Sequence, residues 1–254
     1  MDVDNYTPPP QVPPAAADGA LLTVHEPRVV IGDRGAGWLV EAWDMFKAAS
    51  GSWLLLCLAG IVVFCVINMI PFINILNGVL QPVWIASLLL ACHAQRNGEP
   101  VKVRHLFAGF GPKLGRLILS GVVVGFFSMV ITIVCLWPLL MGLISTADPQ
   151  SLILDQDMNA LILRMLVLMA LLIPFMAAGW FAPALIIFGN MGVQQALVLS
   201  MKGCLKNSWP FLIYGLCLLV LGLLAMLTFG LALLVIVPVV YLSLYLSFRD
   251  IYVD

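Results

Sequence analysis

The chain has 254 residues, of which 62% are hydrophobic and only 10% are charged, and its formal net charge is -1. Soluble domains carry about 25% charged residues, so this composition excludes a soluble globular fold and places most of the chain in lipid. We expect membrane lipids to be its main surroundings, and we expect no nucleic-acid partner.

Residues 1–35 are rich in proline and poor in bulky apolar side chains. Such a segment cannot bury enough surface to offset the entropy lost on ordering, so we predict a disordered Pro-rich tail. It lacks the basic and apolar regions of a cleaved signal peptide, while Pro10 and Pro13 also fit a PxxP ligand. Residues 36–254 are predicted to form one six-span membrane domain.

An amphipathic helix is predicted directly before the first apolar span. Its charged side chains, Glu41, Asp44 and Lys47, lie opposite an apolar face. That face is formed by Trp38, Leu39, Ala42, Trp43 and Phe46. A helix with this pattern is expected to lie in the membrane surface and to lead into the span.

The uncharged intervals of the chain give the number of membrane crossings. A charge near the bilayer centre costs about 2.5–3.5 kcal/mol, and a helical span needs about 20 residues. The predicted crossings lie at about residues 53–70, 76–94, 117–147 and 165–188, with two more within 207–248. Pro138 marks a kink or an end in the third crossing. The predicted fold is therefore an all-α polytopic membrane helix bundle with six transmembrane helices.

The orientation of these spans follows from the basic residues in short loops. Five basic residues lie in the loop 96–116, and Lys202 and Lys206 lie two crossings later. The opposite side holds only Arg164, beside an acidic loop at about 145–160. Both termini are therefore predicted to be cytoplasmic.

The amphipathic pattern returns twice, at residues 102–114 and 193–206, and each time it precedes a pair of spans. The first and last pairs also align without a gap at an offset of 156 residues. The matches are Ser52-Trp53 with Ser208-Trp209, Pro82-Val83 with Pro238-Val239, and Ser87-Leu88 with Ser243-Leu244. The sequence thus predicts three hairpins, each preceded by an interfacial amphipathic helix, as parallel repeats.

Several short motifs resemble those of a known group of proteins. They are Gly37-Trp38-Leu39, Ala42-Trp43, Phe46-Lys47, Leu106-Phe107-Ala108-Gly109-Phe110, Trp180-Phe181-Ala182-Pro183-Ala184, and Tyr245 with Arg249-Asp250. Over residues 37–252 the chain resembles an uncharacterised family of bacterial six-span inner-membrane proteins. It is also remotely similar to YciC-type proteins and to the membrane domain of some glycerophosphodiester phosphodiesterases. The resemblance implies a multi-pass protein of the bacterial inner (cytoplasmic) membrane and no particular activity.

Residues that carry chemistry are scarce. The spans have no ionisable residue at mid-depth, which argues against an ion-coupled or proton-coupled carrier. Six cysteines are scattered without a CxxC or Cys/His spacing, and His93 and His105 lie beside basic residues, so we predict no metal site. Span hydroxyls such as Ser87, Ser120 and Thr132 are expected to bond the preceding turn of their own helices. We predict no catalytic, cofactor-binding or metal-binding residue.

Two patterns in the spans have two interpretations each. Gly121 and Gly125 form a GxxxG pair that serves either internal packing or dimerisation. Prolines recur in the even-numbered spans, with large aromatic residues nearby. They indicate either simple kinks or a hydrophobic cavity between kinked helices. The prolines are Pro82, Pro174, Pro183 and Pro238, and the aromatic residues are Trp84, Trp180 and Tyr241.

The function predicted from these observations is a non-enzymatic structural, assembly or lipid-organising component of the inner membrane, with an unknown membrane-protein partner as an option. The alternative is a transporter or channel for an apolar or lipid-like solute. Lys102, Arg104, Lys113 and Arg116 are the candidate functional residues, because a basic cluster at the membrane threshold binds anionic lipid headgroups. The same charges also serve as topology signals alone.

Overall fold

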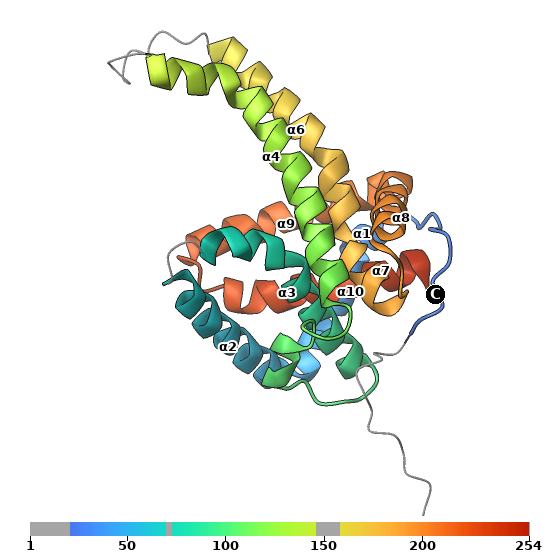
Figure 1. Ribbon diagram of the computed structural model, residues 1–254. Coiled ribbons are helices and arrows are strands. Elements are labelled where there is room, and N and C mark those ends of the chain that lie inside the picture. The colour runs from blue at the N-terminus through green and yellow to red at the C-terminus, as the bar shows by residue number, and fades with distance from the viewer. Residues whose placement is uncertain (1–20, 70–72, 146–157, 254) are drawn as a thin grey trace, which may run out of the picture.

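The structure is a computed structural model that describes residues 21–69, 73–145 and 158–253, and every regular element in these ranges is a helix (Figure 1). The helices are α1 (Arg34–Ala48), α2 (Ser50–Asn68), α3 (Ile73–Arg96), η1 (Val103–Phe107), α4 (Leu114–Ser145), α6 (Met158–Trp180), α7 (Ala182–Phe188), α8 (Val193–Lys206), α9 (Ser208–Leu227) and α10 (Leu233–Tyr252).

Within the described residues, six helical stretches are long and apolar enough to cross a membrane, which confirms by length and composition the expected polytopic membrane protein. They lie in α2, α3, α4, α6 with α7, α9 and α10, in the order that the uncharged intervals predict.

Two boundaries of these spans differ from the prediction. The helix α6 begins at Met158, so it includes Arg164, which the predicted crossing left out. A span can include this residue near its end, because a long cationic side chain can reach the headgroup level. The helix α4 continues through Pro138 to Ser145 and bends near that end (Figure 1).

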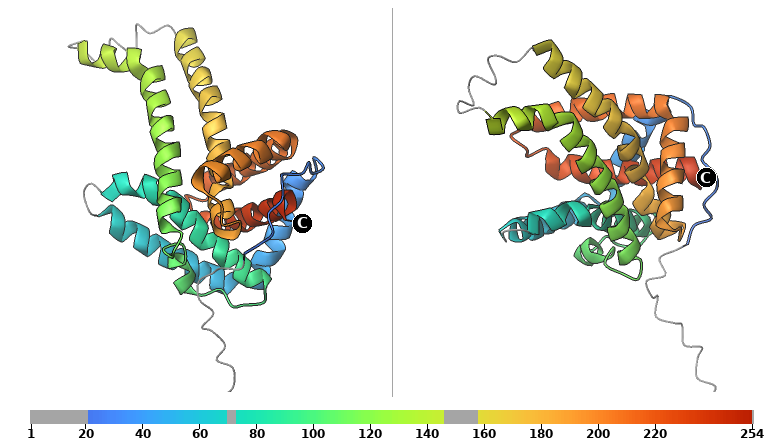
Figure 2. Two further views of the ribbon diagram at one scale, coloured as in Figure 1. Left: turned by 45° about the vertical axis from the view of Figure 1, so that its right-hand side comes forward. Right: turned by 45° about the horizontal axis from the view of Figure 1, so that its top comes forward.

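The helices α3 and α10 form the centre of the molecule. In the 18-residue apolar stretches of these two spans 44% and 56% of the residues are buried, against 11% in the stretch of α2 and 6% in the stretch of the span that includes α6. The helices α4 and α6 run side by side and project beyond the remaining helices (Figures 1 and 2). The low burial of α2 and α6 fits helices whose outer surfaces face lipid, which is as apolar as a protein core.

The predicted fourth span is interrupted near its end. The helix α6 ends at Trp180, and α7 starts with Pro183 in its first turn, where a missing backbone N–H does no harm. The backbone N–H of Phe181 donates to Ser200 Oγ at 2.9 Å, and that hydroxyl donates to the Ala177 carbonyl at 2.6 Å. The hydroxyl of Ser200 in α8 thus provides hydrogen-bond partners for two backbone groups at the break. Every residue of α7 is buried.

The amphipathic helix α1 buries its apolar face inside the protein. Trp38, Ala42 and Phe46 are buried, and the Trp38 ring lies 5.6 Å from the Phe211 ring of α9. A Cβ at Gly35 would overlap the Pro210 carbonyl oxygen, so glycine allows α1 to approach α9 closely. The sequence predicts a helix that lies in the membrane surface, whereas much of this face packs on α9 and α10.

Residues 21–33 lie against the ends of several helices, beside the C-terminal end of α10 in Figure 1. The N–H groups of Leu22, His25 and Arg28 donate to the carbonyls of Phe188, Tyr252 and Ile251 at 3.0, 2.8 and 3.0 Å. Terminal helix carbonyls lack partners within their own helix, so an extended segment with free N–H groups pairs with them. The predicted disordered tail therefore differs from the structure over residues 21–33, and residues 1–20 lie outside the described residues.

The second amphipathic segment forms a short 3-10 helix, η1, instead of an α-helix. The turns at Gly109 and Gly111 end it before α4 begins. A Cβ at Gly109 would overlap the Val83 carbonyl oxygen of α3, which explains a glycine at this close approach. The three predicted amphipathic segments thus all precede a span, but only the first and third are α-helices.

Candidate functional site

The helices α2, α3 and α10 are fixed to one another at one end. Trp53 Nε1 of α2 donates to Gln95 Oε1 of α3 at 2.7 Å, and Gln95 Nε2 donates to the Met45 carbonyl at 2.6 Å. His93 Nδ1 of α3 lies 2.7 Å from the Tyr245 hydroxyl of α10. Beyond these contacts, toward the opposite end of the three helices, lies a cavity.

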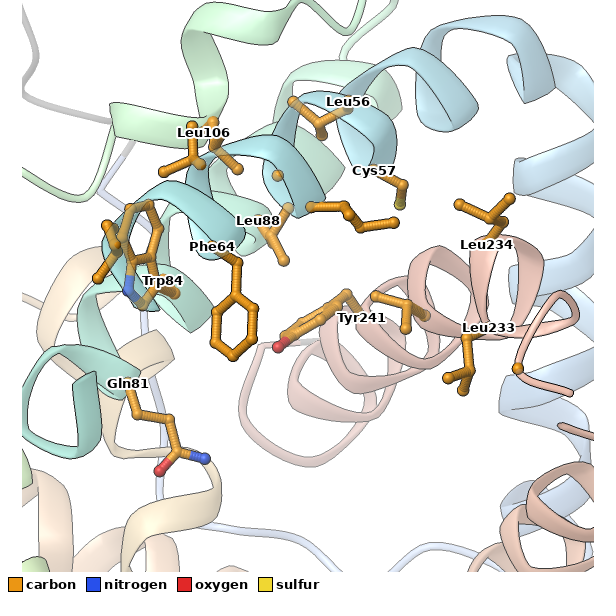
Figure 3. Close-up of a pocket in the computed structure, with 16 residues that line it drawn as sticks. Leu56, Cys57, Phe64, Gln81, Trp84, Leu88, Leu106, Leu233, Leu234 and Tyr241 are labelled. Carbon is orange, nitrogen blue, oxygen red and sulfur yellow. The ribbon is translucent and has the colours of Figure 1, made fainter. Parts of the chain in front are cut away.

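The cavity is open on one side and has a volume of about 550 Å³, which lies within the range of about 300–1,000 Å³ typical of ligand pockets. From α2 the lining includes Leu56, Cys57, Gly60, Phe64 and Ile67, from α3 Gln81, Trp84 and Leu88, from η1 Leu106, and from α10 Leu233, Leu234 and Tyr241. Figure 3 shows the Phe64 and Tyr241 rings reaching into the space from two different helices. The wall is almost entirely apolar, and apart from Leu106 and Gly230 it belongs to candidate membrane spans.

Two polar side chains interrupt this apolar wall. Gln81 is exposed and lies apart from the other labelled residues in Figure 3, while the Tyr241 hydroxyl points toward Phe64. Within the described ranges, neither the Gln81 amide nor the Tyr241 hydroxyl has a hydrogen-bond partner.

The sequence pattern of prolines and aromatic residues identified part of this cavity. Trp84 and Tyr241 line it, as the cavity interpretation requires. Trp180 does not, because its ring packs 6.3 Å from both Phe211 and Tyr214. The lining residues of α2 were not predicted, since in a uniformly apolar helix the side toward a cavity looks like the side toward lipid. Gly60, in the middle of that side, is the one weak signal.

The four predicted headgroup residues fall into two pairs. Lys102 and Arg104 are exposed on η1 and its approach. Lys113 Nζ donates to the Ile187 carbonyl at 2.6 Å, and Arg116 donates to the Asn190 and Met191 carbonyls, both at 3.0 Å. The second pair therefore holds the turn between α7 and α8 in place, a contact across more than 70 residues that local sequence does not show.

Burial lowers the pKa of His105 and is the largest effect on it. The positive charge of Arg104 lowers this pKa further. The lowered pKa favours the neutral imidazole at pH 7, so His105 adds little charge to the exposed pair.

A buried polar cluster joins α3 to α10 near the ends that are fixed together. His93 is 8% exposed, and besides its contact with Tyr245 its Nε2 lies 3.0 Å from Asn97 Nδ2. The partners of His93 are thus neutral hydroxyl and amide groups. No cluster of three or more His, Cys, Asp or Glu side chains that would suit a metal ion occurs in the described part of the chain.

The chain was compared with known protein families, curated proteins and solved structures. No protein-family model, no curated protein and no solved structure matches this chain.

Proposed function

We propose that this chain is a non-enzymatic, lipid-organising component of a bacterial inner membrane, and that it holds a membrane lipid in the cavity between α2, α3 and α10. The observation that carries the proposal is the cavity itself, about 550 Å³ with an almost wholly apolar wall. In a bilayer, acyl chains are the molecules at hand to fill such a space. Filling it restores the dispersion contacts that an empty cavity lacks.

The proposed placement in the membrane follows from the basic residues and the amphipathic segments. The ends of α3, α8 and α10 that carry Arg96, Lys206 and Arg249 would face the cytoplasm, together with both termini. The segments α1, η1 and α8 would lie at that interface, each before a hairpin of spans. The motif resemblance to bacterial inner-membrane proteins supports the same location.

Lys102 and Arg104 are proposed to meet anionic headgroups at this interface, because both are exposed next to the apolar side chains of η1. Each basic residue near an anionic surface contributes about 1 kcal/mol, less where salt screens it. An unidentified membrane-protein partner is also compatible with this role, since α4 and α6 project together beyond the other helices (Figure 2) and carry many exposed large apolar side chains.

A carrier for an apolar or lipid-like solute is the second candidate. It is favoured by Pro82 and Pro238, which lie inside the two central helices beside the cavity. A proline removes one backbone hydrogen bond of a helix and so provides a point for bending. Vesicles containing the purified chain would show accelerated exchange of a fluorescent lipid between leaflets if the protein were a carrier, and no acceleration if it only held lipid.

The lipid-holding role can be tested by filling the cavity. A Cβ at Gly60 makes only ordinary contact, 3.6 Å from a Leu106 methyl group, so the side chain of Gly60→Phe would extend into the space. Gly125→Phe is the matched control, because Gly125 is exposed on α4 and a Cβ there meets nothing within 4 Å.

Lipid that co-purifies in mild detergent is then measured by mass spectrometry per mole of protein. The proposed role expects Gly60→Phe to lose most of the retained lipid and Gly125→Phe to keep it. Equal retention in both variants, with unchanged thermal unfolding, would place the lipid elsewhere and refute the role of the cavity. In the same measurement, changing Lys102 and Arg104 to Gln should lower the anionic share of the lipid only.

A further inference from the structure

The short helix η1 is part of the cavity wall and also carries exposed basic side chains. Leu106 is 6% exposed and lines the cavity, where its methyl group would lie 3.6 Å from a Cβ at Gly60 of α2. Arg104 lies two residues earlier, about 4 Å along the axis of a 3-10 helix, and Lys102 directly precedes η1. These two residues, the basic pair, are both exposed. A lipid whose acyl chain lies against Leu106 therefore has its headgroup within reach of the basic pair.

Aromatic side chains mark the η1 end of the cavity as the level where hydrocarbon meets headgroups. Trp84 of α3 lines the cavity, and its ring lies 6.2 Å from the Phe107 ring and 5.2 Å from the Phe110 ring. Both phenylalanines are exposed, and tryptophan is enriched at this level of a membrane. Figure 3 shows Leu106 and Trp84 at one end of the space and Leu233 at the other. The headgroup of a bound lipid is thus expected at the η1 end.

The lining residues of α2, α3 and α10 add no charge to the cavity. Together with Gly230, which precedes α10, they fall in the intervals 48–95 and 207–248. Neither interval contains an Asp, Glu, Lys or Arg residue. A charged headgroup at the end formed by Gly230 and Leu233 would therefore find no partner of opposite charge in these intervals, whereas the η1 end provides one.

The exposed charge beside the cavity is positive. Glu99 is the only acidic residue in the connection 96–116, and in the described part of the chain neither Lys102 nor Arg104 forms a salt bridge. Basic residues next to a membrane attract anionic lipids. An apolar space beside a basic pair therefore favours a ligand with an acyl chain and an anionic group.

We propose that the cavity and the basic pair form a single site for an anionic glycerophospholipid, with one acyl chain in the cavity and the phosphate held by Lys102 and Arg104. The proposal rests on the proposed lipid-holding function and specifies its ligand. The wall on α2 runs from Leu56 to Ile67, about 16 Å, and one leaflet of the hydrocarbon core is about 15 Å thick. The cavity thus suits one chain, and its open side leaves the second chain in the bilayer. In the proposed orientation the lipid comes from the cytoplasmic leaflet.

The experiment measures which of two phospholipids the purified chain retains. Phosphatidylglycerol is anionic, whereas phosphatidylcholine with the same acyl chains has no net charge. The chain is incubated in mild detergent at low salt with an equal mixture of both, and the bound lipids are quantified by native mass spectrometry. The wild-type chain should retain phosphatidylglycerol roughly tenfold over phosphatidylcholine, because each basic residue contributes about fivefold before screening.

Two double variants test the basic pair. Changing Lys102 and Arg104 to Gln should bring the two lipids to equal retention, without loss of total lipid. The matched control changes Lys47 and Lys202 to Gln, which removes the same charge from exposed positions of α1 and α8, two helices outside the cavity lining. This control should keep the preference for phosphatidylglycerol.

A third variant tests whether the chain and the headgroup belong to the same lipid. Gly60→Phe fills the cavity and leaves Lys102 and Arg104 in place. If the site is single, the preference for phosphatidylglycerol disappears together with most of the lipid, and the lipid that remains shows no preference. Thermal unfolding checks that each variant is folded, and Gly60→Leu, with a smaller side chain, takes the place of Gly60→Phe if the latter unfolds.

Several outcomes would overturn the inference. Equal retention of both lipids by the wild-type chain would mean that the cavity holds lipid without selecting its charge, which leaves the proposed function standing. A preference that survives the loss of the basic pair, or that the control also loses, would assign it to charges elsewhere in the chain. A preference that persists in the filled cavity variant would mean that headgroup and cavity bind different lipids. Retention of neither lipid by the wild-type chain would refute the inference and the proposed function together.

Discussion

Single side chains join parts of this chain that lie far apart in sequence. Asp250 near the end of α10 accepts hydrogen bonds from Arg34 Nε at 2.7 Å and from Trp38 Nε1 at 2.8 Å. Arg34 also pairs with Glu41 at 2.6 Å, and this hydrogen bond is the main reason why the pKa of Arg34 is raised. The carboxylate thus fixes α1 to α10 across more than 200 residues.

We expect Asp250→Asn to destabilise the protein by about 1–3 kcal/mol, because the variant removes one of the two carboxylates that pair with Arg34 and weakens the bond to Trp38. The matched control is Asp44→Asn. The ion pair of Asp44 with Lys47 measures 2.8 Å but is largely exposed, and its removal should cost about 0–1 kcal/mol. Thermal unfolding in detergent measures both, and similar midpoints for the two variants would contradict the structural role of Asp250.

Hydroxyl groups in the spans behave as the sequence predicts. Ser87 donates to the Val83 carbonyl at 2.9 Å, Ser120 to Leu117 at 2.7 Å, and Thr132 to Ser128 at 2.8 Å. Each bond stays within one helix, so local sequence is sufficient to predict it. The Ser87 hydroxyl additionally accepts from the Gly109 N–H at 2.9 Å, a contact between elements that local sequence does not show.

At the scale of helices, close approach depends on glycine at particular positions. A Cβ at Gly121 of α4 would lie 2.6 Å from the Val79 carbonyl oxygen of α3 and 3.1 Å from the Pro82 ring. Gly125, one turn further, is exposed with nothing within 4 Å. The first glycine of the GxxxG pair therefore serves internal packing between α3 and α4, one of the two interpretations that the sequence leaves open.

Gly121→Ala should lower the stability of the protein by about 1–3 kcal/mol, because the backbones of α3 and α4 must separate to admit the methyl group. Gly125→Ala should be neutral or slightly stabilising, since alanine favours a helix and nothing obstructs it. The comparison uses thermal unfolding in one detergent. If Gly125→Ala were the more destabilising of the two, the second glycine would have a partner outside this chain, and dimerisation through this surface would become the better interpretation.

For the molecule as a whole, two central helices organise the others. The spans in α3 and α10 are the most buried, while α2, α9 and the pair formed by α4 and α6 present most of their surface outward. Among the described residues, the buried core lies where the helices converge, at the end that carries α1, α7 and α8. The cavity lies beyond that end, where α2, α3 and α10 are less tightly packed.

The topology of the whole chain gives a direct test. Reporter fusions after Pro100 and after Lys206 should report the cytoplasm, and a fusion after Gln150 should report the outside. The physical reason is the excess of Lys and Arg in the two connections that contain Pro100 and Lys206. The reverse pattern at any one of these three sites would refute the six-span orientation, and with it the placement of Lys102 and Arg104 at the cytoplasmic surface.

The amino-acid sequence by itself determined the number, order and approximate limits of the spans. A charge in hydrocarbon is so costly that uncharged intervals reveal them without knowledge of any contact. Only the tertiary structure decided where the apolar face of α1 packs, that residues 21–33 pair with helix ends, and that Lys113 and Arg116 hold a distant turn. It also decided which side of α2 faces a cavity. These features depend on partners far apart in sequence, and inside a membrane an apolar residue looks the same whether it meets lipid, protein or an open space.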